Sequence, residues 1–560
     1  MLPKGTLAAL LVSGIVWGAP AVGAAVCGDA NSNGIVDAGD AAQLLQYVAG
    51  LVPAGGLCGG SGVAACLDLN QDGTVDIADL VLLLNVVAGN PVLFRCASRG
   101  PTVPCGTSLR STCPDGDPLC RVVSTNLTLP GGCGTFIDGM VLVPAGVVLT
   151  IEPGAMVKGR RYSTDGSPTA LVLLQDAKLN AAGTAAAPIV FTSDQPEGSR
   201  GVGDWGGVVF NGRAPTNCPG GSCLAEGLVG VFFGGTSMND SSGVLSYARI
   251  EYAGVEVAPD NELDAVAFNA VGRGTIVNHV QANVAFDDCF AWFGGTVNAK
   301  HLVASGCGDD MFDWQYGYSG SVQYALGMQD VTGIGFSGAS NGLEGDNNEN
   351  GFDLLPRSDP RFCNVSVVGT KAQGGVPGQS GRRGIHVRRG TAGTISNVIV
   401  TDFTETGVRF DDNATATRAC ADHLTLQTMA PVLSLRNTIL FDNGNTLEMS
   451  GTATSPCTPV EWLALLAATN HVQPGGVADR GPDPGIGRAP YPYTSPRTTQ
   501  YVPAPGGPAQ GSASTRCGSL DVAWMDDVQY LGAFEPGATV PGDAGNWLDT
   551  PGDWISFAAH

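Results

Sequence analysis

A repeat of 22 residues constrains the fold of this chain more than any other feature of its sequence. The segment Thr275–Gly295 is echoed by Val297–Gly317, and short β-branched runs separated by Gly- and Asn-containing turns continue on both sides. Repeats of this length suit the coils of a right-handed parallel β-helix, which stack at roughly 4.8 Å. A β-propeller is the competing architecture, but its blades need about 40–50 residues. An immunoglobulin-like sandwich array fits the repeat less well.

Composition agrees with a mainly β fold. The chain has 81 Gly and only 14% charged residues, which suits many short strands and tight turns. We therefore predict a parallel β-helix over residues 136–535, with residues 97–135 as a Cys/Pro/Gly-rich linker before it. Residues 536–560, with Trp547 and Trp554, are expected to cap the open end of the coil, where strand edges would otherwise be unpaired.

The N-terminal part carries a second repeat, in which two loops place oxygen side chains at positions 1, 3, 5, 9 and 12 and Gly at position 6. These loops, Asp29–Asp40 and Asp68–Asp79, each lead into an amphipathic, helix-like segment. This is the EF-hand arrangement, because calcium takes six to eight oxygen ligands and the Gly permits the sharp turn between them. The predicted ligands of two calcium ions, counting the residue at position 7, are Asp29, Asn31, Asn33, Ile35, Asp37, Asp40, Asp68, Asn70, Asp72, Thr74, Asp76 and Asp79.

The first residues predict export. Within residues 1–25, Lys4 precedes the apolar run Leu7–Trp17 and a small-residue cleavage site, which is typical of a signal peptide. An exported chain with 16 Cys favours disulfides. The matched spacing of Cys27 to Cys58 and of Cys66 to Cys96 predicts that each calcium repeat closes its own bridge. A bridge of this size would contribute roughly 3 kcal/mol to a small module spanning residues 26–96.

The net charge of the chain limits the classes of partner that it can be expected to bind. With 28 basic and 51 acidic residues the net charge is −23, which argues against nucleic acid and anionic membrane surfaces. After the N-terminal segment, no apolar stretch is long enough to cross a bilayer. The expected location is outside the cell or at its surface, and the protein is not expected to be an integral membrane protein.

The tandem of calcium loops resembles the dockerin module over residues 27 to about 90. The resemblance implies calcium binding and a cohesin-type scaffold as partner. Dockerins commonly carry Ser or Thr at loop positions 10 and 11, whereas here these positions are Ala38-Gly39 and Ile77-Ala78. This departure weakens the expectation of a cohesin partner and leaves that of calcium intact.

The second region resembles a family of large secreted β-helix proteins known mainly from bacterial cell envelopes. Matching segments, among them Gly203–Gly207, Ala248–Gly254, Phe293–Val297 and Gly308–Asp310, lie between about 145 and 535. Members of this family are mostly without an assigned reaction. The resemblance therefore implies architecture rather than activity.

Paired acids dominate the candidate chemistry of the β-helix. If the 22-residue register holds, Asp287 and Asp288 stack on Asp309 and Asp310, near Asp313, so the carboxylates need a cation or a proton. Three interpretations stay open: further calcium sites, the acid and base of a glycosidase-like site, or turn Asp residues that bond backbone amides. The weak catalytic candidates are Asp288, Asp309, Asp310 and His386, and the candidate sugar-stacking residues are Trp292, Trp314 and Tyr316.

The leading functional interpretation is a secreted calcium-binding protein whose β-helix binds polysaccharide or cell-envelope components. The rival is a polysaccharide hydrolase or lyase recruited through the dockerin-like module. The third is a structural surface or adhesion protein.

Calcium removal tests the N-terminal assignment. A chelator is expected to unfold residues 27–96 reversibly, because the loops have no other way to satisfy so many oxygens, while the β-helix stays folded. Circular dichroism of the isolated segment, with and without chelator, measures this. A spectrum unchanged by the chelator would contradict the assignment.

Overall fold

The computed structural model describes residues 28, 30–31, 36–53, 57–58, 66–67, 69, 75–87, 100–110, 123–259, 261–330, 340–375, 378, 381–423, 433–449, 482–486, 501–510, 517, 524–538, 547–548 and 554–556. These residues form two compact units, which are treated separately. The first contains residues 1–84 and 94–98, and the second contains residues 85–93 and 99–560. Within the described residues, no helix is both long enough and apolar enough to cross a membrane.

The first unit is organised by two helices, α1 (Ala38–Val48) and α3 (Ile77–Val87). Leu44 and Leu83 are fully buried and lie in one small apolar cluster. Each helix begins at position 10 of a predicted calcium loop, so the last three loop residues form its first turn. At the start of α1, Asp37 and Asp40 form a capping box, in which each carboxylate accepts a backbone N–H of the first turn. The two helices expected at the ends of the calcium loops are therefore present.

The predicted disulfide pairing of this unit is wrong. Cys58 is bonded to Cys66, with a Cα–Cα distance of 6.0 Å, so neither is available for the predicted bridge within its own repeat. The reason is that the chain after α1 returns to the start of the second repeat, where Cys58 and Cys66 lie in the shared apolar cluster. Cys27 and Cys96 lie outside the described residues. The bridge thus joins the two repeats instead of closing one.

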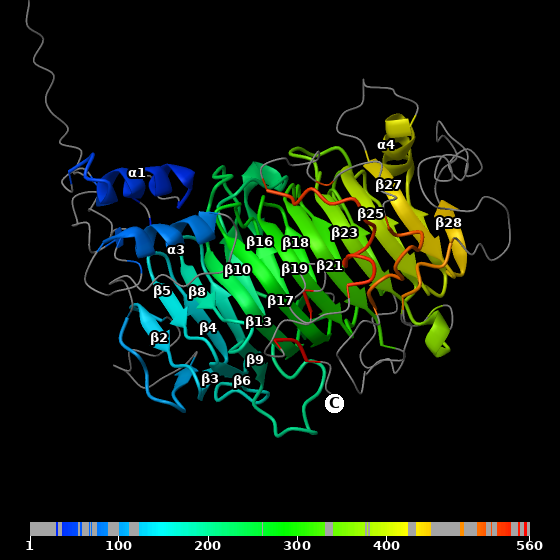
Figure 1. The fold of residues 1–560 in the computed structure, drawn as a ribbon. Helices are drawn as coiled ribbons and strands as arrows, with labels where there is room; N and C mark the ends of the chain where they lie inside the picture. Colours follow the sequence, from blue (N-terminus) through cyan, green and yellow to red (C-terminus); the bar gives the residue numbers. More distant parts are fainter. Residues whose placement is uncertain are drawn as a thin grey trace, which may run out of the picture. The chain divides into compact units, whose positions relative to one another are not determined.

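The second unit is a stack of coils built from two parallel sheets (Figure 1). The 14-stranded sheet contains β1 (Ser108–Arg110), β2 (Leu127–Leu129), β3 (Gly134–Asp138), β5 (Val148–Ile151), β6 (Met156–Gly159), β8 (Lys178–Ala182), β9 (Ile189–Ser193), β13 (Gly243–Ala253), β17 (Ile276–Ala285), β19 (Asn298–Ser305), β21 (Ser321–Met328), β23 (Arg361–Val368), β25 (Gly393–Thr401) and β27 (Leu433–Phe441). The ten-stranded sheet contains β4 (Met140–Val143), β7 (Ala170–Leu173), β10 (Val208–Asn211), β16 (Val266–Asn269), β18 (Phe290–Phe293), β20 (Phe312–Gln315), β22 (Asn341–Gly345), β24 (Arg383–Val387), β26 (Thr406–Phe410) and β28 (Asn445–Met449). From β13 onward each coil adds one strand to each sheet, whereas the earlier coils add two short strands to the larger sheet, such as β8 and β9, which both pair with β13. The predicted parallel β-helix is confirmed.

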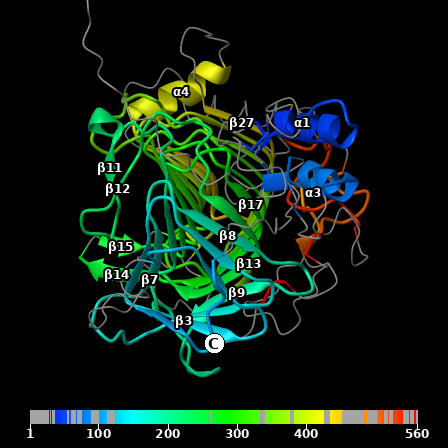
Figure 2. The same cartoon turned by 90° about the vertical axis from the view of Figure 1, so that its left-hand side faces the viewer.

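Two antiparallel hairpins and one helix leave the coils. The hairpins pair β11 (Cys223–Leu224) with β12 (Phe232–Phe233) and β14 (Val255–Ala258) with β15 (Asn261–Leu263). The helix α4 (Asn413–His423) follows β26. Viewed after a 90° turn, successive strands of each sheet lie one behind another around the interior (Figure 2). These excursions explain why the 22-residue spacing is clear in only one part of the sequence.

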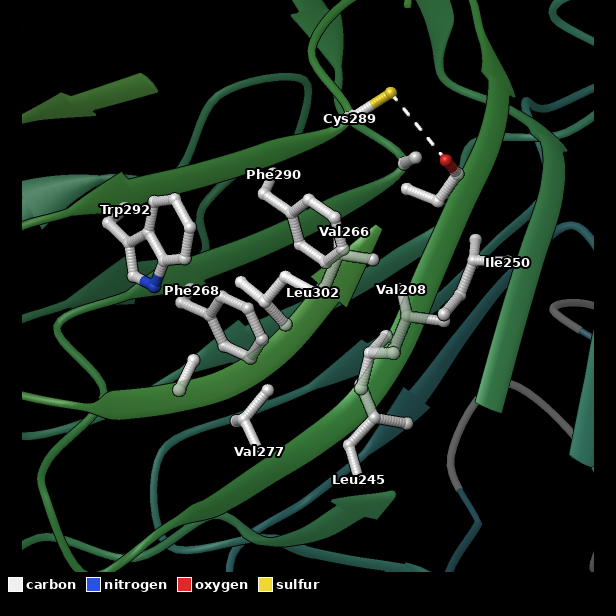
Figure 3. Packing of buried hydrophobic residues seen from close by; sticks show 14 of the residues in the cluster. Val208, Leu245, Ile250, Val266, Phe268, Val277, Cys289, Phe290, Trp292 and Leu302 are labelled. Atoms are coloured by element: carbon white, nitrogen blue, oxygen red, sulfur yellow. Dashed lines mark hydrogen bonds between the residues drawn. The ribbon is translucent and has the colours of Figure 1, made fainter. Parts of the chain in front are cut away.

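The interior of the coils is filled by stacked side chains. Phe268 and Trp292, both labelled in Figure 3, have ring centroids 6.1 Å apart. Phe290 and Phe312 have centroids 5.7 Å apart. These rings belong to neighbouring strands of the ten-stranded sheet that pair in register. In-register pairing therefore places similar residues of successive coils against one another.

The long strands of the 14-stranded sheet share a bend at a left-handed residue in one column. Tyr247, His279, His301 and Tyr324 occupy this position with φ between +43° and +61°. In the next coils the same column holds Asn364, Asn397 and Asn437. Asn tolerates a left-handed backbone better than most residues. In the four coils that carry Tyr or His at this position instead, the neighbouring rings stack on one another.

The predicted limits of the β-helix need two corrections. Strands β1 and β2 lie inside the predicted linker and pair with β3 and β5, so the coil starts before residue 136. At the other end, β28 is the last strand among the described residues. The described residues from 482 onward carry no strand.

The predicted C-terminal cap is also wrong. Trp547 and Trp554 pack on His301 and His279, at the side of the coil stack and far from its last coil. Ser556 exchanges two hydrogen bonds of 2.7 and 2.8 Å with Gln281, and Cys517 is bonded to Cys363. These residues pack on the outer face of the 14-stranded sheet, where its bent strands present rings and amides. The C-terminal segment (described residues 482–556) thus covers a face instead of an end.

The buried imidazole under this segment generates a prediction. Burial lowers the pKa of His279 to about 3, from an ordinary value of 6.5. Above pH 6.5 the ring is neutral in both the folded and the unfolded chain, and stability is at its full value. Between pH 6.5 and pH 3 only the unfolded chain takes up the proton, so the folded state loses stability as the pH falls. The free energy of unfolding should fall by up to about 1.4 kcal/mol per pH unit in this window.

The variant His279→Asn isolates this effect, since Asn already occupies the same left-handed column in three other coils. Denaturant unfolding between pH 7 and pH 5 should show a shallower loss of stability for the variant than for the wild type. Equal slopes would contradict the assignment.

Candidate functional site

The acidic pairs identified in the sequence stack as predicted. Strands β18 and β20 pair with Phe290 opposite Phe312, which places Asp288 beside Asp310 one coil away. The backbone N–H of Asp310 donates to a carboxylate oxygen of Asp288 at 2.8 Å, and the N–H of Asn341 donates to Asp310 at 2.6 Å. The interpretation of these residues as turn Asp residues that bond backbone amides is therefore correct for two of them, but it leaves other carboxylate oxygens to be explained.

These remaining oxygens form two carboxylate groups. Asp287, Asp288 and Asp309 each place one oxygen within 4.8 Å of the others, and so do Asp310, Asp313 and Glu344. The second group is buried throughout, whereas Asp287 and Asp309 are half-buried. Either group has the oxygen chemistry that a hard divalent cation prefers.

The electrostatics of the groups are those of crowded acids. Burial, and then repulsion from Glu344, raise the pKa of Asp313 and of Asp310 well above the ordinary range. Burial, and then repulsion from Asp287, do the same for Asp288. One oxygen of Asp313, a residue only 7% exposed, has no hydrogen-bond partner among the described residues. A bound proton or a cation is required to hold these groups together.

Glu344 differs from its neighbours because cations surround it. It accepts hydrogen bonds from Nδ1 of His386 at 2.9 Å and from the side-chain amide of Asn341 at 3.0 Å, and it forms an ion pair with Arg388. Although burial acts in the opposite direction, the His386 hydrogen bond and the Arg388 charge hold the pKa of Glu344 below its ordinary value. Glu344 is thus the ionised member of its group.

His386 lies between two carboxylates. Its second nitrogen, Nε2, is 2.9 Å from Asp411. Against the effect of burial, the hydrogen bonds with Asp411 and Glu344 raise the pKa of His386, because a protonated ring donates to both acids. A ring held in this way positions Glu344, and it is poorly suited to accept a proton as a general base.

The register of the ten-stranded sheet places this chemistry in one row. Asp313, Glu344, His386, Arg409 and Glu448 are consecutive partners across β20, β22, β24, β26 and β28. The row is acidic at Asp313 and mixed in charge beyond Glu344. It is the outer face of the sheet, because Phe312, Leu343, Ile385 and Val408 alternate with it and are buried.

Comparison with known protein families decides the identity of this second unit. A model of the pectate-lyase-like β-helix domain matches residues 122–456, which is more than half of the chain. The chain belongs to the pectate-lyase-like β-helix family. A model of the dockerin type I domain matches residues 27–88. The chain thus joins a dockerin type I domain to a pectate-lyase-like β-helix domain, and dockerin type I domains bind calcium and cohesins generally.

Whole-chain comparisons add little. A search of the curated proteins found no match. Among solved structures, the catalytic domain of a GH87 alpha-1,3-glucanase in complex with tetrasaccharides matches at 11% identity, over 65% of this chain and 68% of that one. The TM-score is 0.25, so this likeness carries no argument about the site.

The dockerin domain shows part of its two predicted calcium loops. The carboxylates at position 12, Asp40 and Asp79, are fully buried. Asp40 accepts the N–H groups of Asn31 and Asp37, and Asp79 accepts those of Leu69 and Asp76, at 2.7 to 3.0 Å. These bonds fasten the loop ends to the helices. The other predicted ligands, namely Asp29, Asn33, Ile35, Asp68, Asn70, Asp72 and Thr74, lie outside the described residues.

Two of the predicted sugar-stacking residues are not on the surface. Trp292 and Trp314 are fully buried in the interior of the β-helix domain, and Trp314 donates its indole N–H to Thr391 at 3.1 Å. The reason is that side chains alternate along strand β20, Phe312-Asp313-Trp314-Gln315. Asp313 points outward, so Phe312 and Trp314 point into the interior. Tyr316, beyond the strand, is half-buried. The surface-platform interpretation of the two Trp residues is therefore wrong.

The sequence gives only weak signals for several residues of the site. Glu344 and Asp346 belong to the oxygen-rich stretch Glu344–Asp353, which suggests a calcium site but does not follow the EF-hand spacing, and no pattern indicates Asp411. Asp313 and Glu344 are 31 residues apart and Glu344 and His386 are 42 apart, so inserted loops hide the coil register. Only the alternation of polar and apolar residues within each strand could have indicated them.

A glycine substitution tests the inward position of Trp314. A Cβ atom on Gly345 would lie 2.1 Å from the Trp314 ring, so Gly345→Ala should lower the free energy of unfolding by about 1–3 kcal/mol. Gly134→Ala is the control, because its nearest neighbour would be 3.9 Å away, and it should change stability by less than about 0.5 kcal/mol. Equal stability of both variants in urea unfolding would contradict the inward position of Trp314 against Gly345.

Proposed function

We propose that this chain is an extracellular, dockerin-tethered protein that binds polysaccharide through a divalent cation held on the outer face of its β-helix. One observation carries the proposal, namely the second carboxylate group. Asp310, Asp313 and Glu344 bring three buried carboxyl oxygens within 4.8 Å of one another. The dockerin domain supplies the attachment, with calcium as its ion and a cohesin as the proposed partner.

Charge supports a cation in this group. Arg388 forms ion pairs with both Glu344 and Asp346, and Arg389 pairs with Asp346, so these acids are already balanced. Asp310 and Asp313 have no ion pair with Arg, Lys or His within the described residues. A calcium ion would balance their charge and would accept further oxygen ligands from sugar hydroxyl groups.

A second function, polysaccharide hydrolysis, is favoured by a different feature of the same group. The pKa of Asp313 is raised, whereas that of Glu344 is lowered, and one oxygen of each lies within 4.8 Å of the other. Carboxyl pairs with separated pKa values serve as acid and nucleophile in retaining glycosidases, where the groups are about 5–5.5 Å apart. In this case Asp313 would be the general acid and Glu344, oriented by His386, the nucleophile.

A polysaccharide panel separates these functions. The full-length protein is incubated with insoluble and soluble plant and microbial polysaccharides, with calcium or with chelator, and both retention and release of reducing sugar are measured. Calcium-dependent retention without turnover is expected. Asp310→Asn combined with Asp313→Asn should reduce retention at least tenfold.

Asp176→Asn is the matched control. Asp176 is a half-exposed carboxylate paired with Arg213, away from the site, and its left-handed backbone suits Asn. Reducing sugar released by the wild type but not by Asp313→Asn would establish the hydrolase instead. Retention that is equal in chelator and in calcium would contradict the cation.

A further inference from the structure

The C-terminal segment is held to the 14-stranded sheet by two kinds of contact. Its residues 524–538, here named the anchor, are bound through side-chain amides of the sheet. Gln323 exchanges hydrogen bonds of 2.8 and 3.0 Å with the backbone of Asp526, and Asn364 donates to two carbonyl groups of the anchor. Amide groups do not titrate, so these contacts do not depend on pH.

A later part of the segment, here named the flap, packs instead on two imidazole rings. Its described members are residues 547–548 and 554–556. The rings of His279 and His301 are stacked, with centroids 4.2 Å apart. Trp554 meets His279 edge-on at 5.4 Å, and Trp547 lies against His301 at 5.2 Å. The flap is thus seated on side chains whose charge changes with pH.

The environment of the two rings suits only their neutral form. His279 is 7% exposed, and its Nδ1 has no hydrogen-bond partner among the described residues. Nδ1 of His301 lies 2.7 Å from the side-chain oxygen of Asn278. Burial, and then repulsion from His279 and from Lys300, lower the pKa of His301. A proton on either ring would be buried beside a second ring that also loses its place when charged.

No acid nearby is free to balance such a proton, as far as the described residues show. The titratable groups on the elements packed against the pair are Tyr247, Arg249, Glu251 and Tyr252 of β13, Lys300 of β19, Tyr324 of β21, and Asp526, Asp527, Tyr530 and Glu535 of the anchor. Glu251 pairs with Arg249, and Asp526 pairs with Lys300, both at 3.0 Å. None of these carboxylates forms an ion pair with either imidazole.

We propose that the flap is released by acid, when His279 and His301 take up protons, while the anchor stays on the sheet. Opening lets water reach both rings, so two positive charges no longer share a dry site 4.2 Å apart. The disulfide between Cys363 and Cys517 keeps the anchor side of the segment attached. Acid would therefore uncover the row of rings without detaching the whole segment.

Linkage gives the direction and size of the effect. The closed flap holds the pKa of His279 at about 3, and opening restores it towards the ordinary value of 6.5. The closed form is fully favoured above pH 6.5. Below that pH the ratio of closed to open molecules should fall by up to tenfold per pH unit for each of the two histidines.

Fluorine NMR of the full-length protein labelled with 5-fluorotryptophan tests the proposal between pH 7 and pH 4. Signals are assigned by single Trp→Phe substitutions. Those of Trp547 and Trp554 should move to solvent-exposed positions as the pH falls, whereas those of Trp292 and Trp314, which are buried inside the coils, should stay unchanged. Signals of the flap that do not move, or that change only together with the two interior signals, would overturn the proposal.

His279→Tyr combined with His301→Tyr removes the titration and keeps the rings, because Tyr already occupies the same left-handed column at 247 and 324. The flap signals of this variant should not depend on pH. The corresponding double Asn variant, with the residue that three other coils carry in this column, protects the test against overpacking by Tyr. Acid release that persists in either variant would overturn the proposal.

Asp526→Asn is the control for the ion pair between the anchor and Lys300. This variant should release the flap over the same pH range as the wild type, because its two imidazoles are intact. Loss of acid release in Asp526→Asn would assign the pH dependence to the anchor and would refute the role of the histidine pair.

Discussion

In-register pairing of parallel strands is the constraint on which the rest of the β-helix depends. Each coil lies one strand spacing from the next, so a residue meets its counterpart in the neighbouring coil and little else along the stack. Similar residues are therefore brought together in columns. The column of rings through Phe290 and Phe312, and the column of amides through Asn364, Asn397 and Asn437, are two results. Both are stabilising, because rings pack on rings and the side-chain amide of Asn437 donates to that of Asn397 at 2.9 Å.

The same constraint acts against the molecule where the repeated residue is an acid. The register that stacks Phe290 on Phe312 also stacks Asp288 on Asp310, and carboxylates at this distance repel. The chain compensates for this repulsion on one side only. Towards β24, His386 and Arg388 hold Glu344 ionised, whereas Asp313 has no such ion pair among the described residues. A structure that keeps a repulsive cluster in an otherwise apolar and amide-rich stack is best explained by a ligand, and the proposed cation follows from this.

The C-terminal segment covers rings that the coil architecture leaves on the outer face of the 14-stranded sheet. The bent strands of the 14-stranded sheet present Tyr247, His279 and His301 outward, and such a row of rings would be an apolar surface if uncovered. Trp547 and Trp554 cover these rings, and Gln281 and Gln323 bind the returning backbone at Ser556 and Asp526. The disulfide between Cys363 and Cys517 holds the segment to the sheet. The C-terminal segment thus covers the outer face of the 14-stranded sheet, whereas the sequence suggested that it would cap the end of the β-helix.

The sequence by itself determined the class of fold, the acidic pairs and the two-part organisation, because these follow from local repeats. A 22-residue echo is enough to predict a coil, and two loops with oxygens at fixed positions are enough to predict a calcium module. Contacts between residues that are distant in sequence could not be predicted in this way. Inserted loops of unequal length separate Asp313, Glu344 and His386, so no sequence spacing indicates their contact. The partner of Cys58, the interior position of Trp292 and the path of the C-terminal segment were likewise decided by the tertiary structure. The physical reason is that each depends on which face of a strand is enclosed and which segment returns to cover it, and local patterns carry only part of that information.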